Sequence, residues 1–149
     1  MTNESDSVRQ ARAEYFRRAG FAPDGGYADR WVVLRVGRVP VFAFPNVEAR
    51  RRSVRLHDIH HVLTGYDTTW TGESEIGAWE IGSGCRRHWV AWVLNLGAMA
   101  IGFLIAPRRT WRAFRRGRRS GNLYGGAFEE ALLDRTVRDL RTEIGIAPC

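Results

Sequence analysis

The feature that most limits how this chain can fold is an apolar run at positions 89–106, in which only Asn95 is polar. A segment this apolar has to be covered by protein, by lipid or by a bound ligand. Its eighteen residues are at the lower limit for a helix that crosses a bilayer. Arginines flank both ends, so the flanking charge gives no membrane orientation. We expect a helix that is buried or lines a lipid site, and a membrane span is the less favoured alternative.

The N-terminal part of the chain has the patterns of one helix and one hairpin. Ser5 or Asp6 can cap a helix that runs to about Arg18. Two β-rich runs follow, RWVVLRV and RVPVFAF, and they meet at Gly37-Arg38. A two-residue connection between such runs is typical of a short β-hairpin.

The remainder of the chain has helical periodicity. Asn46 can cap a helix that Gly65 would end, because glycine adopts the left-handed conformation found after helices. Thr69 or Thr71 can start the next helix, and an amphipathic helix at about 128–144 would close the chain. These patterns predict a mainly α fold: a helical domain with a small N-terminal β-hairpin.

The length of 149 residues is typical of a single domain with its own core. We expect residues 1–48 to form the helix and hairpin, and residues 49–147 to form the helical region. Cys85 and Cys149 match no metal-ligand spacing, so we expect reduced thiols and no disulfide. A signal peptide has a basic segment followed by an apolar segment, and the N-terminus lacks this order. This favours a cytoplasmic protein.

The net charge of +7 comes entirely from arginine, and it favours anionic partners. Pro107 suits the first turn of a helix, and that helix is rich in arginine. Helical spacing places four arginines on one face and two beside them: Arg108, Arg112, Arg115 and Arg119, with Arg109 and Arg116. This face is either only solvated or binds phosphate or an anionic membrane surface. We expect no nucleic-acid partner, because no known nucleic-acid-binding motif accompanies it.

Histidine and acidic residues gather at residues 56–73, LHDIHHVLTGYDTTWTGE. His57 and His61 are four residues apart, which places both rings on one helical face, where they can bind one metal. Asp58 lies beside them and could bind the metal, orient a water or act as a base. The turn after the helix would bring Glu73 back to the histidines. Two histidines and a carboxylate suit zinc or non-haem iron.

Other interpretations of the same residues remain open. His57 and His61 could be core histidines, with Glu73 only favouring the start of its helix. A hydrolase would use Asp58 as base to a zinc-bound water, but no nucleophile or oxyanion motif accompanies it. We expect His60 to be a surface or outer-sphere residue, and Glu80 to be a surface or interhelix residue that could support the site.

The motif resembles the signature of the coenzyme Q biosynthesis protein four family: His-Asp-x-x-His, eleven residues and then Glu. The matching positions are His57, Asp58, His61 and Glu73. The tail NLYGGAFEEALLDRTVRDLRTEIGI is similar to the closing segment of that family. The resemblance covers about residues 50–147, whereas the first 48 residues differ from the N-terminal helices of the family.

The resemblance implies a mostly helical protein of ubiquinone biosynthesis at a membrane surface. It implies a divalent metal, zinc or iron, on the four motif residues, which would also be catalytic, and a nearby prenyl-lipid cavity. The implied activity is oxidative decarboxylation and hydroxylation at ring carbon 1 of a prenylated hydroxybenzoate-type precursor. A non-catalytic scaffold for other quinone-biosynthesis enzymes is the alternative. A homodimer and peripheral contact with the inner face of the membrane are compatible with this interpretation.

Overall fold

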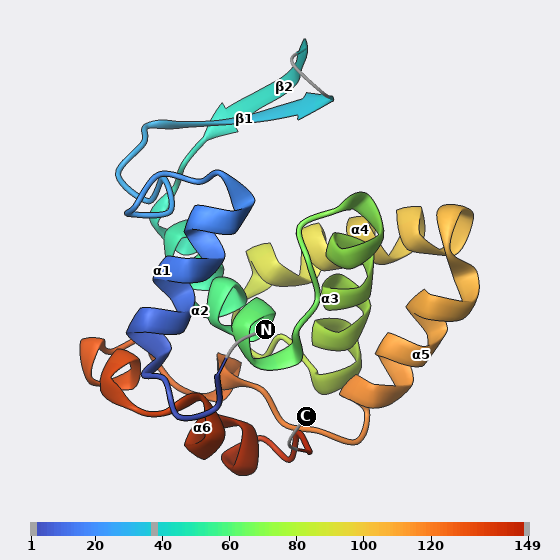
Figure 1. The fold of residues 1–149 in the computed structure, drawn as a ribbon. Helices are drawn as coiled ribbons and strands as arrows, with labels where there is room; N and C mark the ends of the chain where they lie inside the picture. The colour runs from blue at the N-terminus through green and yellow to red at the C-terminus, as the bar shows by residue number, and fades with distance from the viewer. Residues whose placement is uncertain (1–2, 37–38, 148–149) are drawn as a thin grey trace.

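The computed structural model describes residues 3–36 and 39–147. These residues form six α-helices, two short 3-10 helices and a two-stranded sheet. The elements are α1 (Val8–Ala19), β1 (Trp31–Val36), β2 (Val39–Pro45), α2 (Glu48–Thr64), α3 (Trp70–Ser83), α4 (Trp89–Ile105), α5 (Pro107–Gly117), η1 (Leu123–Gly125), η2 (Glu130–Asp134) and α6 (Val137–Glu143). The prediction of a mainly helical fold with a small N-terminal hairpin is confirmed (Figure 1).

The first helix begins slightly later than the sequence predicted. Ser7 is its cap, and its hydroxyl accepts the Gln10 backbone N–H while the Gln10 side chain accepts the Ser7 N–H. This reciprocal capping box satisfies two backbone donors, which neither Ser5 nor Asp6 does here. Gly20 ends the helix in the left-handed conformation, with φ of 71°.

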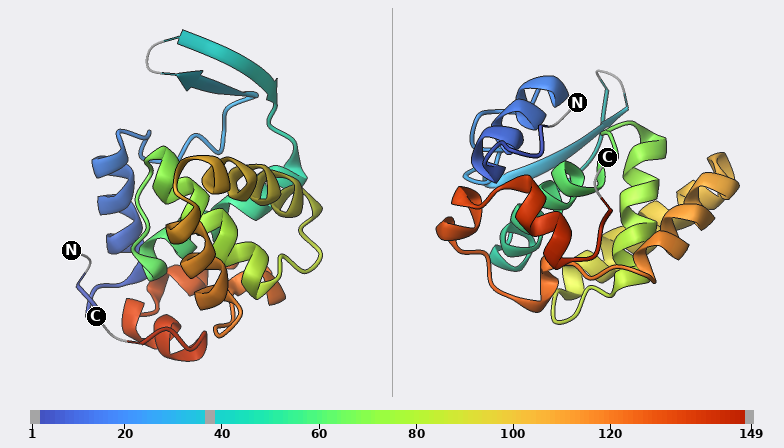
Figure 2. Two further views of the ribbon diagram at one scale, coloured as in Figure 1. Left: turned by 90° about the vertical axis from the view of Figure 1, so that its right-hand side faces the viewer. Right: turned by 60° about the horizontal axis from the view of Figure 1, so that its bottom comes forward.

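The predicted hairpin is present, and it extends away from the helices (Figures 1 and 2). Its strands are antiparallel, with Trp31 opposite Pro45 and an irregular register at Leu34/Arg35. The predicted turn at Gly37-Arg38 lies outside the described residues.

Asn46 has a different role from the predicted helix cap. Val47 occupies the cap position of α2 and makes no side-chain cap hydrogen bond. The Asn46 amide instead donates to the Asp29 carbonyl at 2.8 Å, and its oxygen accepts from Arg50 at 2.9 Å. Asn46 therefore holds the base of the hairpin against the preceding loop. Gly65 ends α2 as predicted, with φ of 79°.

The helix α3 packs closely against both α4 and α5, because small residues line the contacts. A Cβ added at Gly77 would lie 2.9 Å from the Ala98 Cβ of α4. A Cβ added at Gly117 of α5 would overlap the Trp79 carbonyl of α3. The core around these contacts is apolar, and its largest fully buried side chains include Trp79, Leu56, Ile59, Leu63, Ile76 and Leu133.

The apolar run forms α4, which is only partly buried, so the fully buried alternative is wrong. Residues of α4 line a cleft, and a lipid as its ligand stays a prediction. Among its residues only Val90, Ala91, Asn95 and Gly102 are buried. The other side of the helix presents an exposed apolar stripe, composed of Trp89, Trp92, Val93, Leu96, Phe103 and Leu104. None of the elements that the structure describes covers this side. No helix in the described part of the chain is both long and apolar enough to cross a membrane.

The predicted closing helix at 128–144 is wrong. The short η2 and the seven-residue α6 replace it, and Arg135 and Thr136 between them are extended. Thr136 forms a β-bridge with Ser7 and caps α6 by accepting the Asp139 N–H. Pairing with the N-terminal segment therefore interrupts the helical pattern.

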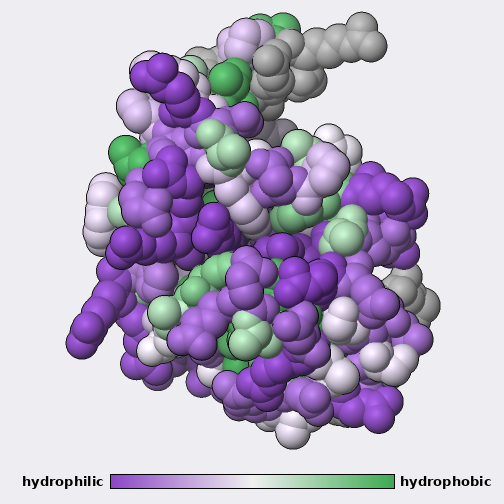
Figure 3. Space-filling view, turned by 90° about the vertical axis from the view of Figure 1, so that its left-hand side faces the viewer, coloured by the Kyte–Doolittle hydropathy of each residue, from purple (hydrophilic) through white to green (hydrophobic). Residues whose placement is uncertain are grey.

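Figure 3 shows that the face with α1 and the C-terminal segment is mostly hydrophilic, with only small hydrophobic groups.

Cys85 is a buried free thiol, and burial raises its pKa to about 12. Cys149 lies outside the described residues.

Candidate metal centre

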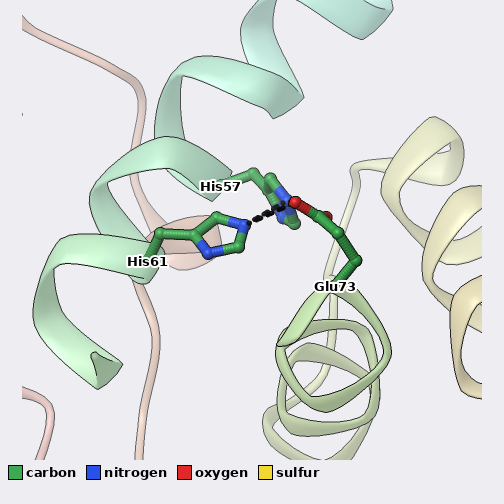
Figure 4. A group of neighbouring side chains, drawn as sticks. All are labelled: His57, His61 and Glu73. Atoms are coloured by element: carbon green, nitrogen blue, oxygen red, sulfur yellow. Dashed lines mark hydrogen bonds and ion pairs between the residues drawn. The ribbon is translucent and has the colours of Figure 1, made fainter. Parts of the chain in front are cut away.

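Three of the four motif side chains converge on one point (Figure 4). The His57 and His61 Nε2 atoms are 3.1 Å apart. The Glu73 carboxylate lies 3.7 Å from the His57 Nε2 and 3.5 Å from the His61 Nε2. Nitrogen ligands of a tetrahedral zinc are about 3.4 Å apart, given Zn–N bonds of about 2.0–2.1 Å. The spacing therefore fits a single metal ion bound by these residues.

The backbone explains why these residues meet. His57 and His61 are one turn apart on α2, so their rings lie on the same face. Gly65 ends α2, and the chain reverses before Thr69, whose hydroxyl caps α3 by accepting the Gly72 N–H. Glu73 is then in the first turn of α3 and faces α2 (Figure 4).

Hydrogen bonds to the far side of each imidazole set its orientation. The His57 Nδ1–H donates to the Glu80 carboxylate at 2.9 Å. The His61 Nδ1–H donates to the Tyr66 carbonyl at 2.9 Å. A carbonyl oxygen can only accept, so the proton of neutral His61 is on Nδ1 and its Nε2 lone pair faces the cluster. Metal-binding histidines typically have such outer partners.

Glu80 is the centre of a buried hydrogen-bond network. Its side chain is fully buried and also accepts from His60 Nδ1 at 2.6 Å, from the Tyr124 hydroxyl at 2.8 Å and from Asn95. The His60 Nε2 accepts the Leu123 N–H at 3.0 Å, so both nitrogens of this ring have partners. Both side chains are fully buried, so the surface alternatives are wrong. Glu80 connects helices, as its interhelix alternative predicted, and an outer-sphere role for either residue stays a prediction.

The carboxylates and His57 influence one another's ionisation. Burial lowers the pKa of His57, but the Glu80 and Glu73 carboxylates outweigh it and hold the pKa well above its usual value. Burial raises the pKa of Glu80, yet the charges and hydrogen bonds of His57 and His60 bring it below the usual value. The site thus keeps two carboxylates ionised around a positive centre, which a metal ion can provide in place of a proton.

Asp58, the fourth motif residue, is near the cluster but outside the converging group. Its carboxylate is buried and accepts a short hydrogen bond from the Tyr27 hydroxyl. Burial raises the pKa of Asp58, and His57 opposes this only in part. Its role as metal ligand or as base therefore stays a prediction.

The cluster opens into a cleft of about 760 Å³ between the hairpin, α1, α2, α3 and α4. His57, Asp58 and Glu73 are among its polar lining residues, which also include Arg50, Ser53, Ser74 and Asn95. Apolar side chains make up most of the remaining lining, and they include Phe21, Phe44, Val54, Trp70, Leu94 and Ile101. The arrangement suits a ligand with a polar group at the cluster and an apolar body.

Several residues of the site had no clear signal in the sequence. Tyr15 stacks on the His61 ring with centroids 5.2 Å apart, and Tyr27 holds Asp58. The Tyr124 hydroxyl donates a hydrogen bond to Glu80, which lies 44 positions earlier in the sequence. Only Asn95 had a signal, as the single polar residue of the apolar run.

The arginines predicted for α5 fall into two groups. Arg109 forms a two-point contact with Glu75, and Arg116 donates to the Thr64 carbonyl and lies over the Tyr66 ring. The other four are exposed: Arg108, Arg112, Arg115 and Arg119. Three of these four also line a hollow of about 420 Å³ with Arg116. Binding of phosphate or a membrane surface by these side chains stays a prediction.

Comparison with protein-family models, with curated proteins and with solved structures gave no match to this chain. The interpretation of its function therefore depends on the geometry of the site and on the motif itself.

Proposed function

We propose that this chain is a metal-dependent protein of ubiquinone or related prenyl-quinone biosynthesis, similar to the coenzyme Q biosynthesis protein four family. The observation that carries the proposal is the convergence of His57, His61 and Glu73 at the polar end of an apolar cleft. Zinc and iron are the metals that this donor set suits best. Two Nε2 atoms and one carboxylate that are directed at the same point support metal binding over separate core histidines.

The proposed substrate is a prenylated hydroxybenzoate-type precursor, and the proposed reaction replaces its ring carboxylate by hydroxyl. The bond from carbon 1 to the carboxylate breaks, a carbon–oxygen bond forms, and carbon dioxide leaves. With dioxygen as oxidant, one oxygen atom enters the new hydroxyl, and the other leaves as water after a donor supplies two electrons and two protons are taken up. A redox metal with open positions would supply oxygen chemistry, whereas zinc would supply only Lewis-acid polarisation.

The side chains of the cleft have distinct tasks in this proposal. His57, His61 and Glu73 hold the metal, and Glu80 keeps His57 in the tautomer that binds it. Asp58 is placed to accept a proton or to provide a further ligand. The apolar walls, which include Trp70 and Ile101, hold the prenyl group and exclude water from the ring.

The test is the metal content of protein purified without a metal-affinity column. We expect about one zinc or iron per chain in the wild type and a loss of metal in His57→Ala, because removal of one of three ligands weakens the site. His88→Ala is the control, since His88 lies outside the cluster and should leave the metal in place. Metal that persists in His57→Ala would contradict the proposed ligand set.

A second candidate is a non-catalytic scaffold that binds prenyl lipid at an anionic membrane. The exposed apolar stripe of α4 favours it, since Val93 and Leu104 are 62% and 85% exposed. Trp89 and Trp92 lie at one end, as is common where proteins meet the membrane interface. Arg87 precedes the stripe and the exposed arginines of α5 follow it, which suits acidic head groups.

Vesicle sedimentation tests this second candidate. Vesicles with phosphatidylglycerol should bind the protein at low salt, and added salt should weaken the binding. Leu104→Asp should reduce binding strongly, whereas Val47→Asp, at the exposed cap position before α2, should not. If the protein is a scaffold, the variant His61→Ala should bind vesicles and partner proteins as the wild type does. Absence of binding at low salt would leave the arginines as a solvated face and would contradict this candidate.

A further inference from the structure

The cleft beside the metal cluster also contains one cationic side chain, Arg50. Arg50 lies seven residues before His57 on α2, so both residues project from the same side of the helix two turns apart. The rise per residue places them about 10 Å apart along the helix axis, with Val54 between them. A ligand in the cleft can therefore contact the cluster and the guanidinium together.

The neighbouring arginines of α2 have other partners. Arg51 and Arg52 form ion pairs with Glu48, and Arg55 lies over the Tyr27 and Phe128 rings. Arg50 lies over the Phe44 ring, 5.9 Å from its centroid, and its Nη1 donates a hydrogen bond to the Asn46 side chain at 2.9 Å. No ion pair with Arg50 occurs among the described residues.

The Nε–H of Arg50 is a buried donor that has no hydrogen-bond partner. Buried polar groups in proteins are nearly always paired, so an unpaired guanidinium donor in a cleft indicates a group that the ligand supplies. Burial also lowers the pKa of Arg50, with only partial compensation from Asp58. The fork of an arginine matches a carboxylate in shape and charge.

We propose that Arg50 is the specificity-determining residue of the cleft and binds the carboxylate of an amphipathic aromatic acid. The carboxylate and ring carbon 1 lie between the Arg50 guanidinium and the His57/His61/Glu73 cluster, and the apolar walls hold the hydrocarbon substituent. This inference rests on the proposed function, because it names the residue that would recognise the acid. Arg50 distinguishes the acid from a neutral product that has lost its carboxylate, which would favour product release.

The experiment measures the binding of three probes to the full chain by quenching of tryptophan fluorescence. The probes are 3-geranyl-4-hydroxybenzoate, its methyl ester and 2-geranylphenol, which is the same compound without the carboxylate. We expect the wild type to bind the acid about 10- to 100-fold more tightly than the phenol, as for a hydrogen bond to a charged group. Arg50→Met should abolish this preference and leave the affinity for the phenol unchanged.

Two further variants make the outcome specific. Arg52→Met is the matched control, since Arg52 is 73% exposed and paired with Glu48, and it should retain the preference for the acid. Arg50→Lys keeps the charge and should retain part of the preference, which shows that the position tolerates substitution. Preference for the acid in Arg50→Met, or no preference in the wild type, would overturn the proposal.

The metal content of the same preparations separates this proposal from the proposed function. A wild type that prefers the acid through Arg50 but holds no metal supports the role of Arg50 and contradicts the metal centre. A wild type that holds metal but binds none of the three probes overturns the role of Arg50 and leaves the metal centre in place.

Discussion

At the residue scale, Glu80 shows how one buried side chain can organise a site. It accepts hydrogen bonds from His57, His60, Asn95 and Tyr124, which come from three different segments of the chain. Each donor would have to leave water to be buried there, and the carboxylate provides the acceptor that makes this favourable. The ring of His57 therefore has its orientation before any metal binds.

Glu80→Gln should lower zinc affinity by about 10- to 100-fold, as for other outer-sphere partners of metal-binding histidines. The amide has no charge, and its NH₂ group would face donors that the carboxylate accepts. Competition with a fluorescent zinc chelator measures the affinity. Glu75→Gln is the control, because Glu75 lies on the same helix but pairs with Arg109 instead. Equal zinc affinity in Glu80→Gln and wild type would contradict the role of Glu80.

The metal-free protein should lose stability in acid. The folded-state pKa values of Glu73 and Glu80 are below the usual 4.5, so their stabilisation is present above about pH 4.5 and is lost as the pH falls below it. The pKa of His57 is raised, so its contribution is complete below its usual 6.5 and is lost as the pH rises through the folded-state value.

Urea unfolding of metal-free protein across the acidic to alkaline range tests this pH dependence. The free energy of unfolding should be highest between the pH at which Glu73 and Glu80 become protonated and the pH at which His57 loses its proton. It should decline on each side of this range. In Glu80→Gln the decline in acid should be smaller. If the free energy of unfolding of Glu80→Gln falls in acid as steeply as that of the wild type, other carboxylates cause the decline.

At the element scale, α3 depends on glycine for its close packing with its neighbours. Gly117 of α5 lies against the Trp79 carbonyl, whereas Gly97 of α4 has open space where a Cβ would be. The two positions therefore respond to the same added methyl group in opposite ways, although both glycines are helical.

Gly117→Ala should destabilise the protein by about 1–3 kcal/mol, because the methyl group forces α3 and α5 apart. Gly97→Ala should stabilise it by about 0.5–1 kcal/mol, because alanine is the better helix former where nothing is displaced. Chemical denaturation followed by circular dichroism measures both changes. A loss of stability in Gly97→Ala equal to that in Gly117→Ala would contradict the assigned packing.

At the scale of the whole molecule, the candidate metal site lies at the rim of the core rather than inside it. The Glu73 side chain is 40% exposed, and His57 is 18% exposed. The apolar core takes residues from all six helices and includes none of His57, His61 and Glu73. We therefore expect the helical fold to persist when the metal is absent.

A chelator should lower the melting temperature without loss of helical circular dichroism at room temperature. Metal that binds only the folded state stabilises it by about 2.7 kcal/mol when its free concentration is 100-fold above Kd. His57→Ala should melt at the same temperature with and without chelator. Collapse of the helical signal on chelation would show that the metal is structural for the whole domain.

Local features were predictable from the sequence because they depend on backbone geometry over a few residues. The positions of His57 and His61 on one face follow from helical spacing, and the end of α2 follows from the conformational freedom of Gly65. The approach of Glu73 also follows, since the connecting turn is short. These features needed no knowledge of the rest of the chain.

Tertiary packing decided the features that depend on residues far apart in the sequence. Asn46 binds the loop before the hairpin, Glu80 meets Tyr124, and α4 leaves one side exposed. The predicted last helix is divided because Thr136 pairs with Ser7, 129 positions away. Each of these contacts forms only when several elements pack together. The intrinsic preference of a short segment therefore cannot determine them.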